Sequence, residues 1–197
     1  WIGKNTNLIN KNHGSWFFIS EIITDIELEI DQPSSNHCGS CNECIDVCPT
    51  SAIIAPYELD ARKCISYLTI ENKESIPKEL RRPIGNRIFG CDDCQIFCPW
   101  NKFAKSPVID DFMPRDVFEN VSLKSLFKWT EKEWDEKTKG SSIRRSGYQG
   151  WLRNIAVALG NSEKEIDTVD VLKSKKGKVS SMVDEHIDWA VEQQLSD

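Results

Sequence analysis

Near its start the chain has a mainly apolar stretch, residues 15–30. The stretch begins with aromatic and β-branched side chains and passes into an alternation of apolar and acidic residues, which is typical of a buried strand that emerges at the edge of a sheet. Partner strands for it are missing from this sequence, so we expect the isolated chain to be partly unstable here. A linker at residues 32–36 follows.

In the last third of the chain, apolar residues recur at helical spacing. The pattern predicts helices near residues 122–128, 131–140, 142–159, 162–174 and 179–195. Thr130 and Glu133 form a capping-box sequence at the start of the second helix. Gly160 is a natural left-handed cap for the third, and Asn161 or Ser162 begins the fourth. The sequence therefore predicts a helical C-terminal domain.

The length of the chain limits the number of hydrophobic cores that it can bury. A chain of 197 residues can bury one good core, or two small ones side by side. The predicted helices pair in an antiparallel way that resembles HEAT repeats. Two pairs fall short of the three or so repeats that a free-standing solenoid needs, so we expect the pairs to pack on the domain before them.

Charge and hydropathy narrow the functional classes. A formal net charge of -6 argues against a general polyanion binder, although basic residues can still gather on one face. No apolar run approaches the roughly 20 residues needed to cross a bilayer, and no export signal is present. We therefore expect a cytoplasmic monomer with no membrane partner. Because Trp1 stands where an initiator Met would be, we also expect a fragment.

Eight cysteines mark the middle of the chain. Cytosolic thiols are held reduced, so clustered cysteines there bind metal or carry out redox chemistry rather than form disulfides. Residues 38–49 read C-x2-C-x2-C-x3-C-P, the spacing of ferredoxin-type 4Fe-4S sites. Residues 91–99 repeat the latter part of this pattern, with Ile88 where the first cysteine would stand. Cys64 is the remaining candidate to replace that cysteine.

A rule of two-cluster ferredoxins assigns these thiols, because the fourth cysteine of each run ligates the other cluster. Cluster one then takes Cys38, Cys41, Cys44 and Cys98, and cluster two takes Cys48, Cys64, Cys91 and Cys94. Two structural zinc sites are the alternative, since C-x2-C is also a zinc-binding element, but zinc sites need no exchange of ligands. Two clusters alone indicate only that single electrons pass through the protein.

The sequence between and around the cysteine runs carries a family resemblance. The chain resembles the C-terminal part of epoxyqueuosine reductases through Trp-Ile-Gly-Lys-Asn-Thr at its start, the segments beginning at Cys64, Ile76 and Ile84, and Arg-Asn-Ile-Ala-Val-Ala-Leu-Gly-Asn at 153–161. The resemblance implies an α+β protein in three parts. They are a remnant of a nitroreductase-like α/β cobalamin domain at 1–31, a ferredoxin-like double 4Fe-4S domain at 32–110 and a HEAT-like helical domain at 111–197.

The same resemblance implies an activity. In the family, epoxyqueuosine at the wobble position of tRNA is reduced to queuosine, and an external one-electron donor supplies cobalamin through the two clusters. The family's proton-donating Asp and most of its cobalamin domain lie upstream of Trp1, so we expect this chain to be inactive alone and assign it no catalytic residue. The alternatives are a two-cluster electron-transfer module and a corrinoid-dependent reductase of small molecules, related to dehalogenases.

Individual contacts follow from the resemblance as well. The residues expected at the cobalamin are Lys4, Asn5, Ser66, Tyr67 and Asp92. This arrangement implies that cluster two is proximal to cobalt and that cluster one is the outer port. Alternatively, Lys4 is solvated on a turn, and Asp92 caps a helix.

A basic run is expected to meet the anticodon stem-loop of the tRNA. Its members are Lys78, Arg81, Arg82 and Arg87, and in the tail Arg144, Arg145 and Arg153 extend the basic surface. The alternative for the first four is a charged helix face paired with Glu74 and Glu79.

Overall fold

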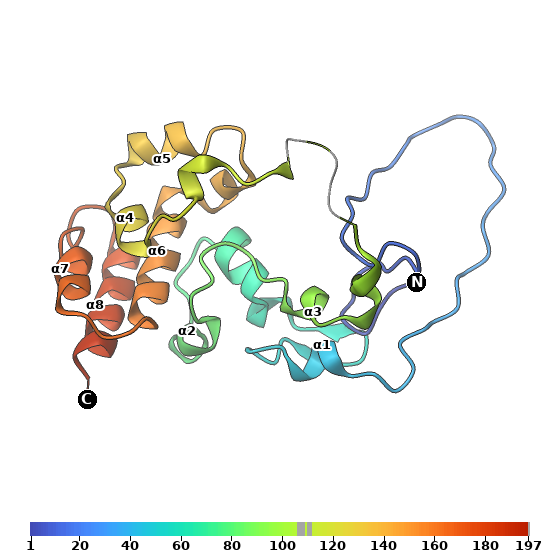
Figure 1. Cartoon of the computed structure of the whole chain (residues 1–197), viewed down its shortest axis with the longest axis horizontal. Helices are drawn as coiled ribbons and strands as arrows, with labels where there is room; N and C mark the ends of the chain where they lie inside the picture. The colour runs from blue at the N-terminus through green and yellow to red at the C-terminus, as the bar shows by residue number, and fades with distance from the viewer. Residues whose placement is uncertain (106–108, 110–111, 197) are drawn as a thin grey trace. The chain divides into compact units, whose positions relative to one another are not determined.

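A computed structural model of the protein describes residues 1–105, 109 and 112–196 (Figure 1). Its internal contacts divide the chain into two compact units. Unit 1 consists of Trp1–Asp60 and Asp92–Asp110, and unit 2 consists of Ala61–Cys91 and Asp111–Asp197. This grouping differs from the predicted domains, because the insert between the cysteine runs belongs with the helical residues. The boundary predicted between residues 110 and 111 lies outside the described residues.

Unit 1 is built from short elements (Figure 1). Helices α1 (Glu43–Asp46) and α3 (Asp93–Ile96) lie within the two cysteine runs and pack against each other. Strands β1 (Ile53–Ala55) and β2 (Glu58–Leu59) form a small antiparallel hairpin. The 3-10 helix η3 (Pro99–Phe103) follows the second run. Pro49 follows α1, and Pro99 is the first residue of η3, a position where its missing N–H is not needed.

The strand predicted within residues 15–30 is not formed, and this expectation is corrected. The segment contains neither helix nor strand and follows an extended path through the blue part of Figure 1. Ile22, Ile23 and Ile30 are at least 90% exposed. A strand satisfies its N–H and C=O groups through a neighbour, and no described segment of the chain pairs with this one.

Unit 2 is helical. Its first part forms η1 (Ala61–Lys63), the π-helix η2 (Tyr67–Glu71) and α2 (Lys78–Ile84). Its second part forms η5 (Asp116–Phe118), α4 (Leu123–Lys128), α5 (Glu131–Lys137), η6 (Ser142–Ser146), α6 (Gly147–Gly160), α7 (Ile166–Lys173) and α8 (Ser181–Leu195). Within the described residues, no helix has the length and apolar character to span a membrane.

Helix α6 is the centre of unit 2 and packs against α2, α4, α5 and α8. Trp151, Leu152 and Ile155 on α6 are buried, as are Phe127 on α4 and Ile187 on α8. Burying one such side chain stabilises a fold by about 1.5–3 kcal/mol. The apolar core of unit 2 is therefore a substantial source of stability.

The helical pattern in the sequence is largely confirmed. Helices α4, α5 and α8 match the first, second and fifth predictions to within a few residues. The predicted capping box is present, since Thr130 Oγ1 accepts the Glu133 N–H at 3.2 Å and Glu133 Oε2 accepts the Thr130 N–H at 2.8 Å. The third predicted helix is divided at Gly147, whose φ of +70° separates η6 from α6.

Gly160 is needed for a reason other than the predicted left-handed cap. It is the last residue of α6, and Asn161 after it has a φ of -93°. A Cβ atom on Gly160 would lie 2.6 Å from the Trp189 ring and 2.9 Å from the Ala190 Cα. Glycine at this position therefore permits the close approach of α8 to α6.

The fourth predicted helix begins later than expected, at Ile166 rather than at Asn161 or Ser162. The Asn161 side chain instead donates to the carbonyl oxygens of Arg81 at 2.7 Å and Gly85 at 3.0 Å. These bonds connect the end of α6 to α2. An asparagine that resembles a helix cap in the sequence thus serves as a tertiary contact.

Candidate metal centre

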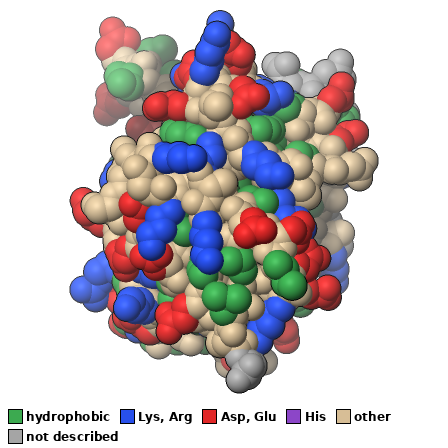
Figure 2. Space-filling model, turned by 90° about the vertical axis from the view of Figure 1, so that its left-hand side faces the viewer, with side chains coloured by type: hydrophobic (Ala, Val, Ile, Leu, Met, Phe, Trp, Pro, Cys, Tyr) green, Lys and Arg blue, Asp and Glu red, His purple; other side chains and the backbone are tan. Residues whose placement is uncertain are grey.

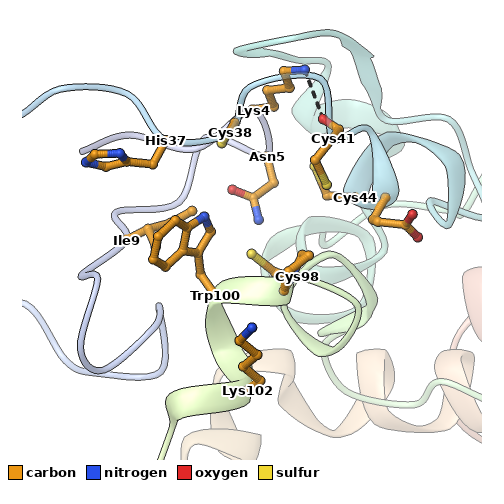
Figure 3. A pocket seen from close by; sticks show the side chains of 12 residues that line it. Lys4, Asn5, Ile9, His37, Cys38, Cys41, Cys44, Cys98, Trp100 and Lys102 are labelled. Carbon is orange, nitrogen blue, oxygen red and sulfur yellow. Dashed lines mark hydrogen bonds between the residues drawn. The ribbon is translucent and has the colours of Figure 1, made fainter.

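Four cysteine side chains of unit 1 line one cavity of about 320 Å³ (Figure 3). They are Cys38, Cys41, Cys44 and Cys98, the four that the spacing assigns to cluster one. The turn before α1 carries Cys38 and Cys41, α1 itself carries Cys44, and Cys98 lies just beyond α3. Because α1 packs against α3, two distant parts of the sequence meet at this cavity.

The thiols in this cavity influence one another. Burial raises the pKa of Cys44 to about 11, and the neighbouring Cys98, Cys38 and Cys41 add to the rise. Burial also raises the pKa of Cys98. Four neighbouring thiolates would repel one another, so their joint ionisation needs a positively charged partner in the cavity.

The spacing of these groups distinguishes between kinds of metal centre. A structural zinc ion draws four ligand atoms to within about 2.3 Å of one point. In a 4Fe-4S cluster the four thiolates are spread around an inorganic core. Among the described residues, no group of three or more His, Cys, Asp or Glu side chains is arranged to hold a single metal ion. The four thiols lie around one cavity, which is the arrangement that a cluster requires.

Lys4 contacts the first cysteine turn. Its Nζ donates to the carbonyl oxygen of Cys41 at 2.9 Å (Figure 3). It also donates to the Gly39 carbonyl oxygen at 2.9 Å and to Asn42 Oδ1 at 3.1 Å. These bonds use the three N–H donors of an ammonium group. The alternative of a merely solvated lysine is therefore wrong. The pairing of Lys4 with a corrin group stays a prediction, and it would compete with these bonds.

Asn5 and Asn7 contact the second cysteine run. Asn5 is buried, and its side chain donates to the Cys94 carbonyl oxygen at 3.0 Å while accepting the Asn7 N–H at 3.1 Å. The side-chain amide nitrogen of Asn7, Nδ2, lies 3.8 Å from Cys94 Sγ. One turn of the chain, residues 4–7, thus touches both cysteine runs of unit 1. The cobalamin contact of Asn5 stays a prediction.

The thiols assigned to cluster two belong to both units. Unit 1 contains Cys48 and Cys94, and unit 2 contains Cys64 and Cys91. Within unit 1, Cys48 Sγ accepts the Ala52 N–H at 3.3 Å, which is the kind of bond that stabilises a thiolate ligand. This second set of ligands stays a prediction.

Within unit 2, the residues before Cys91 pack on the helix that follows Cys64. The Gly90 N–H donates to Thr69 Oγ1, in η2, at 2.9 Å. In the same region Ser66 is the residue before η2, and Tyr67 is exposed. The cobalamin contacts expected of Ser66 and Tyr67 stay predictions.

Asp92 precedes α3 in unit 1, as its capping alternative requires, but its side chain makes no capping bond. Its Oδ1 instead accepts the Gln95 side-chain amide at 3.2 Å. The Asp92 side chain is exposed. Its contact with cobalamin stays a prediction.

The predicted tRNA-binding set contains a residue that cannot reach a phosphate. Arg81 is 1% exposed, and its guanidinium donates to the Ile76 carbonyl oxygen at 2.8 Å and to Glu185 Oε1 at 2.5 Å. The prediction for Arg81 is therefore wrong, because its donors face the interior of unit 2. The other members remain accessible: Lys78 and Arg82 are exposed, and Arg87 is half-buried.

Arg153 is also removed from the basic surface, because it is buried on α6. Its guanidinium donates to the carbonyl oxygens of Leu68 at 2.6 Å, Asn72 at 2.8 Å and Glu74 at 2.6 Å. Burial lowers the pKa of Arg153 to about 10. This arginine holds the insert that carries Cys64 and Cys91. The only sequence signal for the role was a charged residue on an otherwise apolar helix.

The rest of the expected basic surface is mixed in charge. Arg144 pairs with Asp135, and Arg145 pairs with Glu71. The face of the molecule in Figure 2 shows lysine and arginine side chains among aspartates and glutamates. Arg144 and Arg145 are therefore partly neutralised by neighbouring carboxylates.

Comparison with known proteins defines the class first. A family model described as "4Fe-4S double cluster binding domain" matches residues 37–101, which contain all eight cysteines. The match supports two 4Fe-4S clusters and agrees with the grouping of thiols around the cavity. The chain thus contains a double-cluster iron-sulfur domain.

The particular relatives are epoxyqueuosine reductases. The chain is 54% identical to that of Xanthomonas campestris pv. campestris over 193 residues, which are 98% of this chain and 54% of the relative. The solved Bacillus subtilis enzyme matches with a TM-score of 0.91 and 33% identity, over 98% of this chain and 52% of that one. A structure of an epoxyqueuosine reductase with an epoxyqueuosine-modified tRNA-Tyr stem loop matches with a TM-score of 0.90 and 32% identity, over the same shares.

These matches confirm the resemblance seen in the sequence. The chain is homologous to epoxyqueuosine reductases along almost its whole length. It spans about half the length of the curated relatives that it matches.

Proposed function

We propose that this chain is the electron-relay part of an epoxyqueuosine reductase, which reduces epoxyqueuosine to queuosine at the wobble position of tRNA in the cytoplasm. The observation that carries the proposal is the cavity lined by the thiols of Cys38, Cys41, Cys44 and Cys98. Homology to reductases of this name supports the substrate. The relative solved with a modified tRNA stem loop supports the kind of partner.

The residues of this chain hold and shield redox groups in this proposal. Cluster one is ligated by the four thiols of the cavity, and cluster two by Cys48, Cys64, Cys91 and Cys94. The clusters supply one-electron transfer, and cobalamin held mainly by another part of the protein supplies the chemistry at the epoxide. Cys48, Cys64, Cys91 and Cys94 would hold the cluster nearer the cobalamin, and the four thiols of the cavity would hold the cluster that accepts electrons from an external donor.

The proposal extends to the parts at either end. Residues 1–31 belong to a nitroreductase-like cobalamin domain, the rest of which would cover the exposed apolar side chains of segment 15–30. Helices α4 to α8 form a HEAT-like domain, and the packing of α6 on α8 and of α7 on α8 supports that reading.

The test uses the full-length protein that contains this chain, purified without oxygen. We expect the visible absorption and iron content of two 4Fe-4S clusters, and conversion of epoxyqueuosine to queuosine in tRNA, followed by mass spectrometry of nucleosides. Cys44→Ser should lose about half of the iron and reduce turnover more than tenfold. Ser40→Ala in the same turn, which removes no thiol, is the matched control.

Two results would overturn the proposal. A colourless protein with two zinc ions would exclude the clusters. An iron-loaded protein that passes electrons to an acceptor dye but leaves epoxyqueuosine in tRNA unchanged would favour the alternative, an electron-transfer module.

The corrected basic surface gives a test of RNA binding. Lys78→Gln with Arg82→Gln should weaken binding of the tRNA stem loop and lower the slope of log affinity against log salt by about 1 for each phosphate that is no longer neutralised. The control is Lys173→Gln with Lys178→Gln, an equal change of charge at exposed positions at the end of α7 and in the turn after it. An unchanged slope in the first variant would remove both residues from the RNA interface.

A further inference from the structure

Lys4 is bonded to three residues of the cysteine turn that precedes α1. Its ammonium group lines the same cavity as the four thiols and is bonded at three points of residues 39–42. We propose that Lys4 is a positioning residue that fixes this turn and raises the reduction potential of cluster one. The inference rests on the proposed ligation of cluster one by Cys38, Cys41, Cys44 and Cys98.

The bonds of Lys4 act on peptide groups inside the ligand run. The carbonyl groups that it binds, those of Gly39 and Cys41, share their peptide units with the N–H groups of Ser40 and Asn42. A cation on a carbonyl oxygen polarises the peptide and makes its N–H a stronger donor. Donors and positive charge around a cluster favour its reduced form, which carries one more electron.

The position of the charge is fixed by the surrounding chain. The Lys4 carbonyl oxygen accepts the Tyr57 N–H at 3.0 Å, and the Gly3 N–H donates to the Asn7 carbonyl oxygen at 2.8 Å across the same turn. Asn5 is anchored to the second cysteine run through the Cys94 carbonyl oxygen. A half-buried cation held in this way acts through a lower effective dielectric than a mobile surface lysine does.

Two other charged side chains line the cavity. They are Glu43 and Lys102, and their charges are opposite in sign, so their effects on the potential oppose each other. Lys4 differs from a charge that merely lies nearby, because it bonds directly to the backbone that bears the ligands. A nearby charge could change the potential of the cluster without these bonds to the Gly39 and Cys41 carbonyl oxygens.

The experiment is a potentiometric titration of the full-length, cluster-loaded protein, followed by electron paramagnetic resonance, with iron content measured on the same samples. In Lys4→Met, one of the two cluster midpoints should fall so that the ratio of reduced to oxidised cluster at fixed potential drops about tenfold, about 59 mV for one electron. Lys4→Arg keeps the charge and should stay within about a factor of three of the parent protein. Lys11→Met removes an exposed cation from the same N-terminal segment and should change neither midpoint.

The outcomes separate this inference from the proposed function. Parent protein without two iron-sulfur midpoints would overturn the cluster assignment itself. Lys4→Met with full iron and unchanged midpoints, or an equal shift in Lys11→Met, would overturn the role of Lys4 alone. If Lys4→Met takes up too little iron, Lys4→Gln, which keeps an N–H donor and removes the charge, is titrated and judged in the same way.

Discussion

Unit 2 buries a continuous apolar core around α6, whereas the buried apolar side chains described in unit 1 are Ile9, Ala52 and Ile53. Unit 1 instead holds its turns through polar side chains that bond the backbone, as Lys4 and Asn5 do. A neutral bond of this kind, such as that of Asn5, contributes about 1 kcal/mol net, less than a well-buried apolar side chain. Unit 2 can therefore be stable through packing, whereas unit 1 depends on the group that its thiols bind.

Removing iron should produce the largest difference between the units. We expect an anaerobic chelator to release the cysteine turns, so that the amides of residues 38–60 and 92–104 lose their protection from hydrogen exchange. The amides of α6 and α8 should keep theirs, because those helices are held by apolar packing. Exchange followed by mass spectrometry on the full-length protein measures both. If the cysteine turns stay protected in the iron-free protein, unit 1 does not depend on the group that its thiols bind. If α8 loses protection to the same extent, unit 2 is not stable through packing alone.

Acid should weaken unit 2 through a buried histidine. His186 is fully buried, its Nε2 accepts the Ile76 N–H at 3.1 Å, and its Nδ1–H donates to the Met182 carbonyl oxygen at 2.7 Å. Burial lowers the pKa of His186 from 6.5 to about 4, the charges of Arg81 and Arg153 add to the fall, and Glu185 opposes it. Protonation of His186 at Nε2 would turn this acceptor into a donor, and two N–H groups, those of Nε2 and Ile76, would then face each other.

The sign of the effect follows from the lowered pKa. The stability that neutral His186 contributes is fully present above pH 6.5 and is lost as the pH falls from about 6.5 to about 4. The free energy of unfolding falls by up to about 3 kcal/mol over this range. Hydrogen exchange of α8 across this range measures it. His186→Gln, which keeps an acceptor for the Ile76 N–H but does not titrate, should flatten the dependence. An equally steep dependence in that variant would assign the effect to other groups.

The smallest expected effect concerns the cap of α5. Thr130→Ala removes the side-chain acceptor for the Glu133 N–H, and should lower the stability of unit 2 by about 1 kcal/mol. Denaturant unfolding followed by the helical circular dichroism signal measures the change. Lys132→Ala, at an exposed position of the same helix, should cost less than about 0.5 kcal/mol. Equal effects of the two changes would mean that the cap contributes nothing beyond helix propensity.

Local patterns predicted the helices of unit 2 and the grouping of four thiols around one cavity. The 3.6-residue period located α4, α5 and α8, and the Thr130 cap could be read directly. The four-thiol cavity matched the cross-ligation rule, because cysteine spacing within each run reflects the geometry of the cluster. Both successes rest on signals that are contained in short stretches of sequence.

Contacts between distant residues were missed. Arg81 and Arg153 read as surface cations, since nothing local to them shows that the insert and α8 bury their guanidinium groups. Lys4 could not be matched with a turn 35 residues away. The segment 15–30 had strand-forming composition, but a strand also needs a neighbour, which its own sequence cannot supply.

The interleaving of the two units has a practical consequence for dissecting the molecule. The chain leaves unit 1 after residue 60 and returns to it at residue 92. A single truncation therefore cannot yield either unit alone, because each would keep a segment of the other. Ending the chain at residue 105 would leave the insert 61–91 without α6, whose Arg153 and Asn154 bind its carbonyl oxygens. Isolating the helical part would require joining two separate stretches of the gene, and a circularly permuted chain offers a direct way to do so.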